Sequence, residues 1–335
     1  MIGHVANTLR ALPCVKFLCA QHREGKRQTS VKSGNIGVLE GARSSRITAV
    51  DPGSIEETPA RLKSAGRFRN CAAQDLREQN NNRVAIGAVP IDSVTMTGAV
   101  DRVYMHLVSH RRHPFIVTGA NAQFVNTANR DPELASFLRA ADLNVADGIS
   151  LLMAARILGV KLPERITGID LMVELCGLAA QTERTVYLFG GMEGAAEGAA
   201  SFLRARYPGL KIVGTDRPPM GREFDPIVVR QTRSRIIESR PDFLFVCLGV
   251  PRQEKWIQQF VPGLPVNVVM GNGAAFDVLA GFFHRPPVWI QKIGMEWFYR
   301  LCMEPKRLWR RYLLGNILFI EHIVAQGLGR TWRTS

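Results

Sequence analysis

The sequence predicts an α/β fold: a doubly wound, mostly parallel Rossmann-like sheet, followed by a C-terminal helical appendage. Short runs of β-branched and aromatic residues alternate with helical stretches of about ten to fifteen residues. Two such runs within residues 243–271 flank a helix, which predicts a βαβ unit whose strands are buried on both faces. After Pro287 the chain changes to aromatic and basic helical segments.

The expected elements follow in chain order. A strand and turn at residues 84–92 precede a helix at 96–110. Further strands are expected at residues 115–118, 143–146, 185–189, 211–214, 243–248 and 266–271. Further helices are expected at residues 122–128, 132–141, 149–158, 193–207 and 226–239, and from Pro251 onwards. Beyond Pro287, Pro305 separates a helix at 289–302 from one at 306–326.

Composition divides the 335 residues into three parts. Residues 1–82 lack sustained periodicity and are expected to be a disordered extension, 83–287 form the α/β core, and 288–335 form a basic amphipathic appendage. The net charge is +14, and residues 284–335 carry 9 Lys and Arg against 3 acids. Basic ends on a neutral core indicate a polyanionic partner, either a membrane surface or diphosphate groups. Nucleic acid is disfavoured because no recognised reading motif is present.

Cysteine spacing and hydropathy indicate the cellular compartment and bear on metal binding. The six cysteines form no CxxC pair or ligand-spaced cluster, so neither a metal ion nor another cofactor is expected. No uncharged apolar run of about 18 residues predicts a spanning helix, and the N-terminus does not match a signal peptide. We therefore expect a protein of the reducing cytoplasm, and a homo-oligomer is kept open.

Polar residues follow the predicted strands. Residues 249–254 and 271–277 should face one shared crevice, because ligands bind beyond the carboxyl ends of parallel strands. Asp147 closes one strand and opens a helix, which suits a helix N-cap. The same position suits an ionised general base. Residues 190–194, Gly-Gly-Met-Glu-Gly, suggest a dinucleotide loop with Asp216 as the ribose-binding acid, although a plain tight turn explains them equally well.

Several motifs in order resemble the WecB/TagA/CpsF glycosyltransferases (glycosyltransferase family 26). The resemblance covers about residues 84–309. Its motifs are LGVPRQEKW at 248–256, GxGxxFD at 271–277 with Ala-Gly at 280–281, RPP at 285–287, MEWFYR at 295–300 and EPKR at 304–307. Upstream, Asn121, Ala-Asp-Gly at 146–148 and RxTGxD at 165–170 fit the same family.

The resemblance implies roles for particular residues. Asp147 is the expected general base, and Gln253 and Arg300 are expected to be catalytic residues beside it. Gln253 and Asp277 are expected to line the sugar-nucleotide pocket. The chain has no Asp-x-Asp motif for a divalent ion, so arginines should neutralise the diphosphate leaving group. The arginines placed in family motifs are Arg165, Arg285, Arg300 and Arg307. For Arg165 and Arg285 the alternative is a surface ion pair.

Two further residues concern the donor and acceptor. Asn121 is expected to bond a sugar hydroxyl or the nucleotide. The family usually has Thr-x-Asn here, whereas this chain has Gly119, with Thr118 one place earlier. A hydroxyl in the pocket is therefore missing or shifted.

The resemblance implies an inverting glycosyltransferase. It would move a sugar, such as N-acetylmannosamine or a related hexose or uronic acid, from a UDP-sugar to a polyprenyl-diphosphate-linked saccharide for surface polysaccharide. The appendage would associate with the inner face of the cell membrane, as its aromatic and arginine-rich face permits; the alternative is packing on the core. Two other functions are weighed: an NAD-dependent oxidoreductase using residues 190–194, and a non-enzymatic membrane adaptor.

Overall fold

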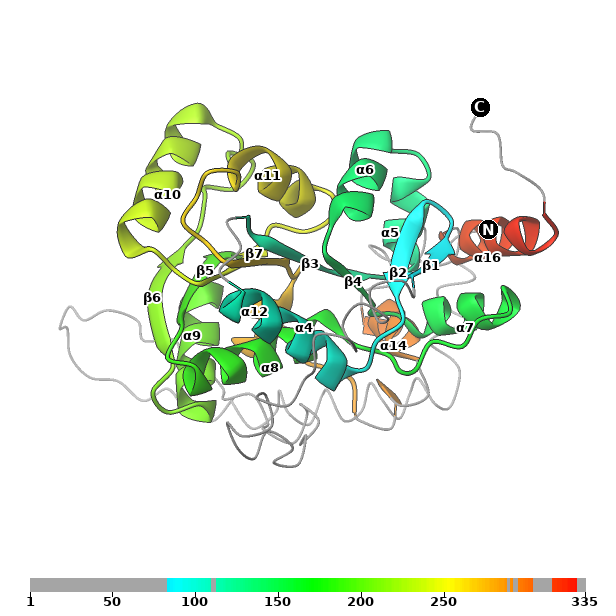
Figure 1. The fold of residues 1–335 in the computed structure, drawn as a ribbon, viewed down its shortest axis with the longest axis horizontal. Helices are drawn as coiled ribbons and strands as arrows, with labels where there is room; N and C mark the ends of the chain where they lie inside the picture. Colours follow the sequence, from blue (N-terminus) through cyan, green and yellow to red (C-terminus); the bar gives the residue numbers. More distant parts are fainter. Residues whose placement is uncertain (1–82, 110–112, 288–289, 292–294, 304–314, 330–335) are drawn as a thin grey trace, which may run out of the picture.

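The computed structural model describes residues 83–109, 113–287, 290–291, 295–303 and 315–329 (Figure 1). The expected N-terminal extension, residues 1–82, lies outside these ranges, as do Pro305 and Arg307. Arg300 belongs to a described helix, but its side chain lies outside the description.

A six-stranded sheet forms the centre of the fold, in the order β4-β3-β8-β7-β5-β6. All neighbouring strands are parallel, which confirms the predicted α/β class. The strands are β3 (Phe115–Ala120), β4 (Leu143–Ala146), β5 (Thr185–Gly190), β6 (Lys211–Asp216), β7 (Phe243–Cys247) and β8 (Val268–Gly271). Thr118 of β3 pairs with Asn144 on one side and with Gly271 on the other, so the carboxyl ends of β3, β4 and β8 lie close together.

Helices cover both faces of the sheet (Figure 1). One core cluster contains side chains of α4 (Met96–Val108), α8 (Gly168–Gln181), α9 (Ala195–Arg206) and α12 (Ala275–Leu279). The other contains side chains of α5 (Ala122–Ala128), α6 (Pro132–Ala140), α7 (Ile149–Ile157), α10 (Pro226–Ser239) and α11 (Arg252–Phe260). In β7, Phe243 and Phe245 pack into the first cluster, and Leu244 and Val246 into the second. This alternation explains why buried strands appear as continuous apolar runs.

The expected strand and turn at residues 84–92 is an antiparallel hairpin of β1 (Arg83–Ile86) and β2 (Val89–Asp92), separate from the main sheet. Asp92 anchors it. The Asp92 carboxylate accepts hydrogen bonds from Arg83 Nε at 3.1 Å, Arg102 Nη1 at 2.7 Å and the Asn144 backbone N–H at 2.8 Å. One buried carboxylate therefore joins the hairpin to α4 and β4.

Helix α8 was not among the expected elements. Its residues Leu171–Ala179 are all buried, so the sequence lacks the polar face that marks an amphipathic helix. Thr167 is its N-cap, and the Thr167 hydroxyl oxygen accepts a hydrogen bond from the Asp170 N–H at 3.1 Å. This helix brings the motif at residues 165–170 to the sheet.

The appendage is described only in part. The expected helix at 289–302 overlaps α14 (Glu296–Met303), and the one at 306–326 overlaps α16 (Gly315–Gly327). Helix α16 packs on the core through buried Phe319 and Ile323. Gln326 accepts from the Gly87 N–H at 2.9 Å and donates to the Ala85 carbonyl at 2.8 Å. Among the helices within the described ranges, none is long and apolar enough to cross a membrane.

Candidate active site

The site lies at the carboxyl edge of the sheet, where the connections after β3 and β8 diverge. The chain after β3 enters α5 on one face, whereas the chain after the neighbouring β8 enters α12 on the other. Such a switch point is where ligands bind in open parallel sheets. A polar residue directly follows each of three neighbouring strands: Asn121 follows β3, Asp147 follows β4 and Asn272 follows β8.

Asp147 is held beside β3. Its backbone N–H donates to the Ala120 carbonyl at 2.8 Å. The N-cap of α7 is Gly148, so Asp147 does not occupy the cap position that the sequence suggested. A Cβ built on Gly119 would lie 3.7 Å from the Asp147 Cβ, which places the carboxylate next to the end of β3.

Asn121 is the N-cap of α5. Its Oδ1 accepts hydrogen bonds from the N–H groups of Gln123 at 3.0 Å and Phe124 at 3.2 Å. A Cβ built on Gly148 would lie 3.4 Å from the Asn121 Cβ, so the loops carrying Asn121 and Asp147 are in contact. The cap bonds orient the carboxamide and leave its Nδ2 to donate elsewhere. The contact with sugar or nucleotide stays a prediction.

Arg285 forms the most buried charged contact of this edge. Its Nη1 donates to Asp170 Oδ1 at 2.7 Å and its Nη2 to Asp170 Oδ2 at 3.1 Å. Arg285 thus forms the ion pair that the alternative expected, but its side chain is only 3% exposed, so the pair is buried rather than on the surface. Burial alone would raise the pKa of Asp170, but the hydrogen bonds and charge of Arg285 outweigh it and lower that pKa. The pair is therefore ionised, and it fixes the loop before Pro286 on the first turn of α8.

A second ion pair reaches the appendage. Arg165 Nη1 lies 2.6 Å from Glu296 Oε1 at the start of α14. Burial lowers the pKa of Arg285, but the hydrogen bonds and charge of Asp170 raise it, with smaller contributions from the charges of Glu296 and Asp147, and the pKa is raised overall. These groups therefore lie within electrostatic range of Arg285. The resulting cluster has three carboxylates, from Asp147, Asp170 and Glu296, and two guanidinium groups, from Arg165 and Arg285. Two arginines already matched by carboxylates cannot by themselves neutralise a diphosphate.

Further cations would come from the appendage. Arg300 belongs to α14, the helix that Glu296 joins to Arg165, and Arg307 lies outside the described residues. Their roles at the diphosphate stay predictions.

Gln253 joins the loops after β7 and β8. Its Oε1 accepts hydrogen bonds from the Gly249 N–H at 3.2 Å and the Gly273 N–H at 2.8 Å, and its Nε2 donates to Glu254 Oε1 at 2.7 Å. The two loops expected to share one crevice are thus in direct contact. Gln253 is 1% exposed, and these bonds define it as a residue that positions the loops. Its assignment as a catalytic residue stays a prediction.

Asp277 joins α12 to the loop after β5. Its Oδ1 accepts from the Met192 N–H at 2.7 Å, and burial raises its pKa although this hydrogen bond lowers it in part. Contact with the sugar nucleotide stays a prediction for Asp277.

The loop at residues 190–194 has a structural explanation. A Cβ built on Gly190 would lie 2.3 Å from the Cys247 carbonyl oxygen, and the Gly191 N–H donates to that oxygen at 2.7 Å. Glycine is therefore needed where β5 meets the end of β7. Asp216, the suggested ribose acid, lies 2.7 Å from Arg235 Nη2 and accepts from Thr232. The tight-turn interpretation thus accounts for the motif.

Thr118 does not replace the hydroxyl missing at Gly119. Its side chain is 2% exposed, and its Oγ1 donates to Asn144 Oδ1 at 2.5 Å inside the sheet. A Cβ on Gly119 would lie 3.4 Å from the Gly168 Cα. The hydroxyl is therefore missing from this edge rather than shifted.

Four residues of this edge carry no role predicted from the sequence: Asn272, Asp170, Thr167 and Glu296. Asn272 follows a buried strand between two glycines, which is the signal that could have found it. Its amide atoms Nδ2 and Oδ1 are buried, and neither has a hydrogen-bond partner among the described residues. Asp170 belongs to the RxTGxD motif at residues 165–170, but its pairing with Arg285 gave no signal because the two residues are distant in sequence.

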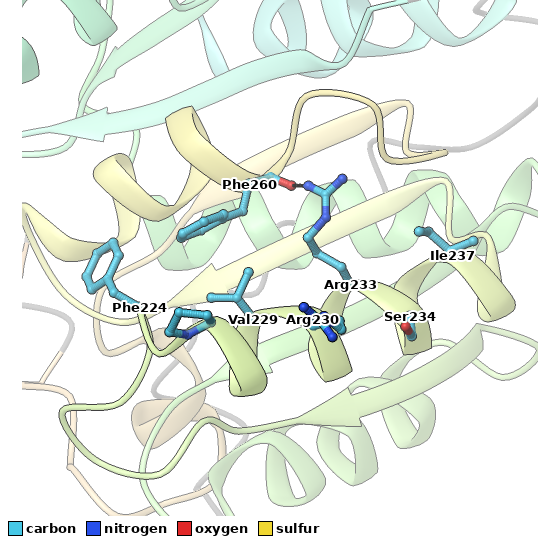
Figure 2. Close-up of a pocket in the computed structure, with 8 residues that line it drawn as sticks. Phe224, Val229, Arg230, Arg233, Ser234, Ile237 and Phe260 are labelled. Atoms are coloured by element: carbon cyan, nitrogen blue, oxygen red, sulfur yellow. Dashed lines mark hydrogen bonds between the residues drawn. The ribbon is translucent and has the colours of Figure 1, made fainter.

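A groove lies between α10 and α11, away from this edge (Figure 2). Arg233 donates to the Phe260 carbonyl across it, and Phe224, Val229 and Ile237 make it largely apolar. It contains none of the predicted site residues, so we do not place the chemistry there.

Glu254 makes the stability of the fold depend on pH. Burial raises its pKa to about 7, while hydrogen bonding from Gln253 lowers it in part. Between its ordinary value and pH 7 the unfolded chain loses this proton and the folded chain keeps it, so stability falls as pH rises. One pKa unit corresponds to about 1.4 kcal/mol. The free energy of unfolding of Glu254→Gln, relative to that of wild type, should therefore rise by about 3 kcal/mol from pH 5 to pH 8.

Urea unfolding at pH 5, 6.5 and 8, followed by far-UV circular dichroism, measures this difference. Glu238→Gln, at an exposed position on α10, is the control and should show no such gain. An equal stability difference for Glu254→Gln at pH 5 and pH 8 would contradict the prediction.

The chain is similar over most of its described length to known proteins. The model of the "Glycosyl transferase WecG/TagA/CpsF family" matches residues 84–333. The N-acetylglucosaminyldiphosphoundecaprenol N-acetyl-beta-D-mannosaminyltransferase of Bacillus subtilis (strain 168) is 31% identical over 225 residues, 67% of this chain and 85% of the relative. The proteins of the same name from Bacillus spizizenii and Staphylococcus aureus (strain MW2) are 32% and 30% identical, over 65% and 69% of this chain and 82% and 89% of theirs.

A doubly wound parallel sheet with a carboxylate and arginines at its carboxyl edge is typical of the nucleotide-binding α/β class of proteins. With the match over residues 84–333, the protein is a glycosyltransferase. The chain belongs to the WecG/TagA/CpsF glycosyl transferase family. The oxidoreductase and adaptor alternatives gain no support from these similarities.

Proposed function

We propose that this enzyme transfers a sugar from a UDP-sugar to a polyprenyl-diphosphate-linked saccharide, with inversion at the anomeric carbon. The observation that carries the proposal is the position of Asp147, at the end of β4 and within electrostatic range of the buried Arg285–Asp170 pair. The names of the relatives, which state an N-acetylmannosaminyl transfer to N-acetylglucosaminyldiphosphoundecaprenol, support this substrate class.

Asp147 would act as the general base. As the acceptor hydroxyl oxygen bonds to the anomeric carbon, the Asp147 carboxylate takes the hydroxyl proton, and the bond from that carbon to the β-phosphate oxygen breaks. UDP leaves with the bonding electrons. Arg165, Arg285, Arg300 and Arg307 are proposed to offset its negative charge, with no divalent ion required. N-acetylmannosamine is the first donor sugar to test. Because Gly119 lacks the hydroxyl of the family threonine, related hexoses and uronic acids are the donor sugars to test next.

The test is UDP release by the purified full-length chain in EDTA. A panel of UDP-sugars is offered with a short-chain polyprenyl-diphosphate-linked N-acetylglucosamine. We expect acceptor-dependent release with one donor, at a rate that EDTA does not change. No release across the panel by folded protein, with liposomes present, would overturn the proposed function. Liposome binding without any release would instead favour the adaptor.

We further propose that the enzyme works on the inner face of the cell membrane through an apolar surface of α16 and α7. One stripe of α16 is exposed, with Ile317 at 61%, Ile320 at 59% and Val324 at 45%. It adjoins α7, since a Cβ on Gly327 would lie 3.8 Å from Ile157 Cγ2, and Ile157 is 57% exposed. An apolar face of this kind suits insertion among lipid head groups.

The same assay tests this surface. Ile320→Glu with Val324→Glu should lower turnover about tenfold or more on acceptor embedded in anionic liposomes, and leave turnover on a soluble short-chain acceptor unchanged. Ile227→Glu, an exposed apolar position on α10, is the matched control. Equal turnover of variant and wild type on liposomes would show that this surface does not bind the membrane.

A further inference from the structure

The backbone of Asn272 is fixed at the centre of the carboxyl edge. Its N–H donates to the Val246 carbonyl of β7 at 2.9 Å, and its carbonyl accepts from the Ala275 N–H at 3.0 Å. The strand before it, β8, lies between β3 and β7. The side chain therefore extends from a fixed backbone position between β3, which leads to Asn121, and β7, which leads to Gln253.

The carboxamide of Asn272 differs from that of Asn144, the other asparagine that is buried among the described residues. The residue is 9% exposed, and its Nδ2 and Oδ1 are both buried with no hydrogen-bond partner among the described residues. Asn144, by contrast, accepts from Thr118 and donates to the Leu138 carbonyl. A buried amide without partners destabilises a fold, so an apolar residue of similar size would be more stable at this position. Its presence points to a ligand.

Asn272 lies close to the proposed base. A Cβ on Gly168 would lie 3.3 Å from Asn272 Oδ1, and a Cβ on Gly119 would lie 3.4 Å from the Gly168 Cα and 3.7 Å from the Asp147 Cβ. Asn272 thus adjoins Gly168, Asp147 adjoins Gly119, and these two glycines are in contact with each other. Because the base must reach a hydroxyl that attacks the anomeric carbon, we infer that a polar group two glycines away from it lies on the side of the sugar ring rather than of the uracil.

We propose that the Asn272 carboxamide hydrogen-bonds polar substituents of the donor's sugar ring and so selects the donor; this rests on the proposed function. A carboxamide offers N–H donors and a carbonyl acceptor side by side, which matches hydroxyl and acetamido substituents. A site that is built to bond such groups discriminates strongly against sugars that lack them, because its own buried polar atoms would stay unpaired.

The test compares two ligands that differ only in the sugar. Calorimetric titration of Asn272→Leu should show an affinity for the cognate UDP-sugar reduced at least about tenfold, and an affinity for UDP within about twofold of wild type. The melting temperature should stay the same or rise. Asn272→Ala, which removes the amide without adding bulk, provides the same comparison if the leucine is not accommodated.

The outcomes separate the possibilities. Unchanged affinity for the UDP-sugar, or equal losses for UDP and UDP-sugar, would overturn the proposal. A wild-type chain that binds neither ligand would overturn the proposed function itself. Asn267→Leu is the matched control at the amino end of β8, where Asn267 Nδ2 donates to Asp242 Oδ1 at 2.8 Å. It should show the opposite pattern, a lower melting temperature with unchanged UDP-sugar affinity.

Discussion

The variant Asp147→Asn is expected to turn over about a thousandfold more slowly than wild type, with its fold and its affinity for the UDP-sugar intact. General-base catalysis contributes about a hundredfold to ten-thousandfold, and an amide of the same shape cannot accept the acceptor's proton. Gly148 is the cap of α7, so no cap is lost. Steady-state UDP release gives the turnover, and calorimetric titration with the donor gives the affinity.

Asp142 provides a matched control for this experiment. It precedes β4 by one residue, as Asp147 follows it by one, and its Oδ2 accepts from the Ile116 N–H at 2.8 Å. Because Asp142 lies at the opposite edge of the sheet, Asp142→Asn should keep near-wild-type turnover. If Asp147→Asn also kept near-wild-type turnover, with an intact fold, the assignment of Asp147 as the base would be wrong.

The largest expected loss of stability is that of Arg285→Met. It leaves the Asp170 carboxylate largely buried without its bidentate partner, and removing one partner of a buried ion pair costs about 3–5 kcal/mol. The pKa of Asp170 is lowered in the folded chain, so the pair stabilises above the unfolded pKa and this contribution is lost as pH falls through the folded value. Urea unfolding at neutral pH and at about pH 3 measures both effects.

Two comparisons control this prediction. Arg222→Met breaks the exposed Arg222–Asp225 pair, 2.6 Å long, and should cost far less stability than Arg285→Met because solvent screens an exposed pair. Arg285→Met combined with Asp170→Asn removes both charges and should recover part of the loss, as a double-mutant cycle would report. A cost for Arg285→Met no larger than for Arg222→Met would show that the pair does not hold the loop before Pro286.

Most elements were predictable because their periodicity is local. The helix expected at residues 226–239 has those bounds as α10, and the strand at 143–146 has them as β4. Helix α8 was not predicted, since Leu171–Ala179 are buried on all sides and leave no polar face to reveal the period. The hairpin β1–β2 was expected as a strand and turn, because its pairing partner lies within the same short stretch.

The site was predictable only in its list of residues. Motifs named Asn121, Asp147, Arg165, Gln253, Asp277 and Arg285, and the structure brings the loops that carry Asn121 and Asp147 into contact. The same list could not separate residues that face a ligand from residues that hold loops. Gln253 has its oxygen on two backbone N–H groups, whereas Asn272, which no motif marked, has neither amide atom bonded within the described residues.

The sequence by itself determined the parallel α/β class, because buried strands and intervening helices are encoded in short apolar runs and their spacing. It also determined that polar residues follow the strands. Only the tertiary structure decided which of them meet. Arg285 and Asp170 are 115 residues apart in the chain and 2.7 Å apart in space. Such pairing follows from strand order and loop packing, which depend on contacts that no local pattern records.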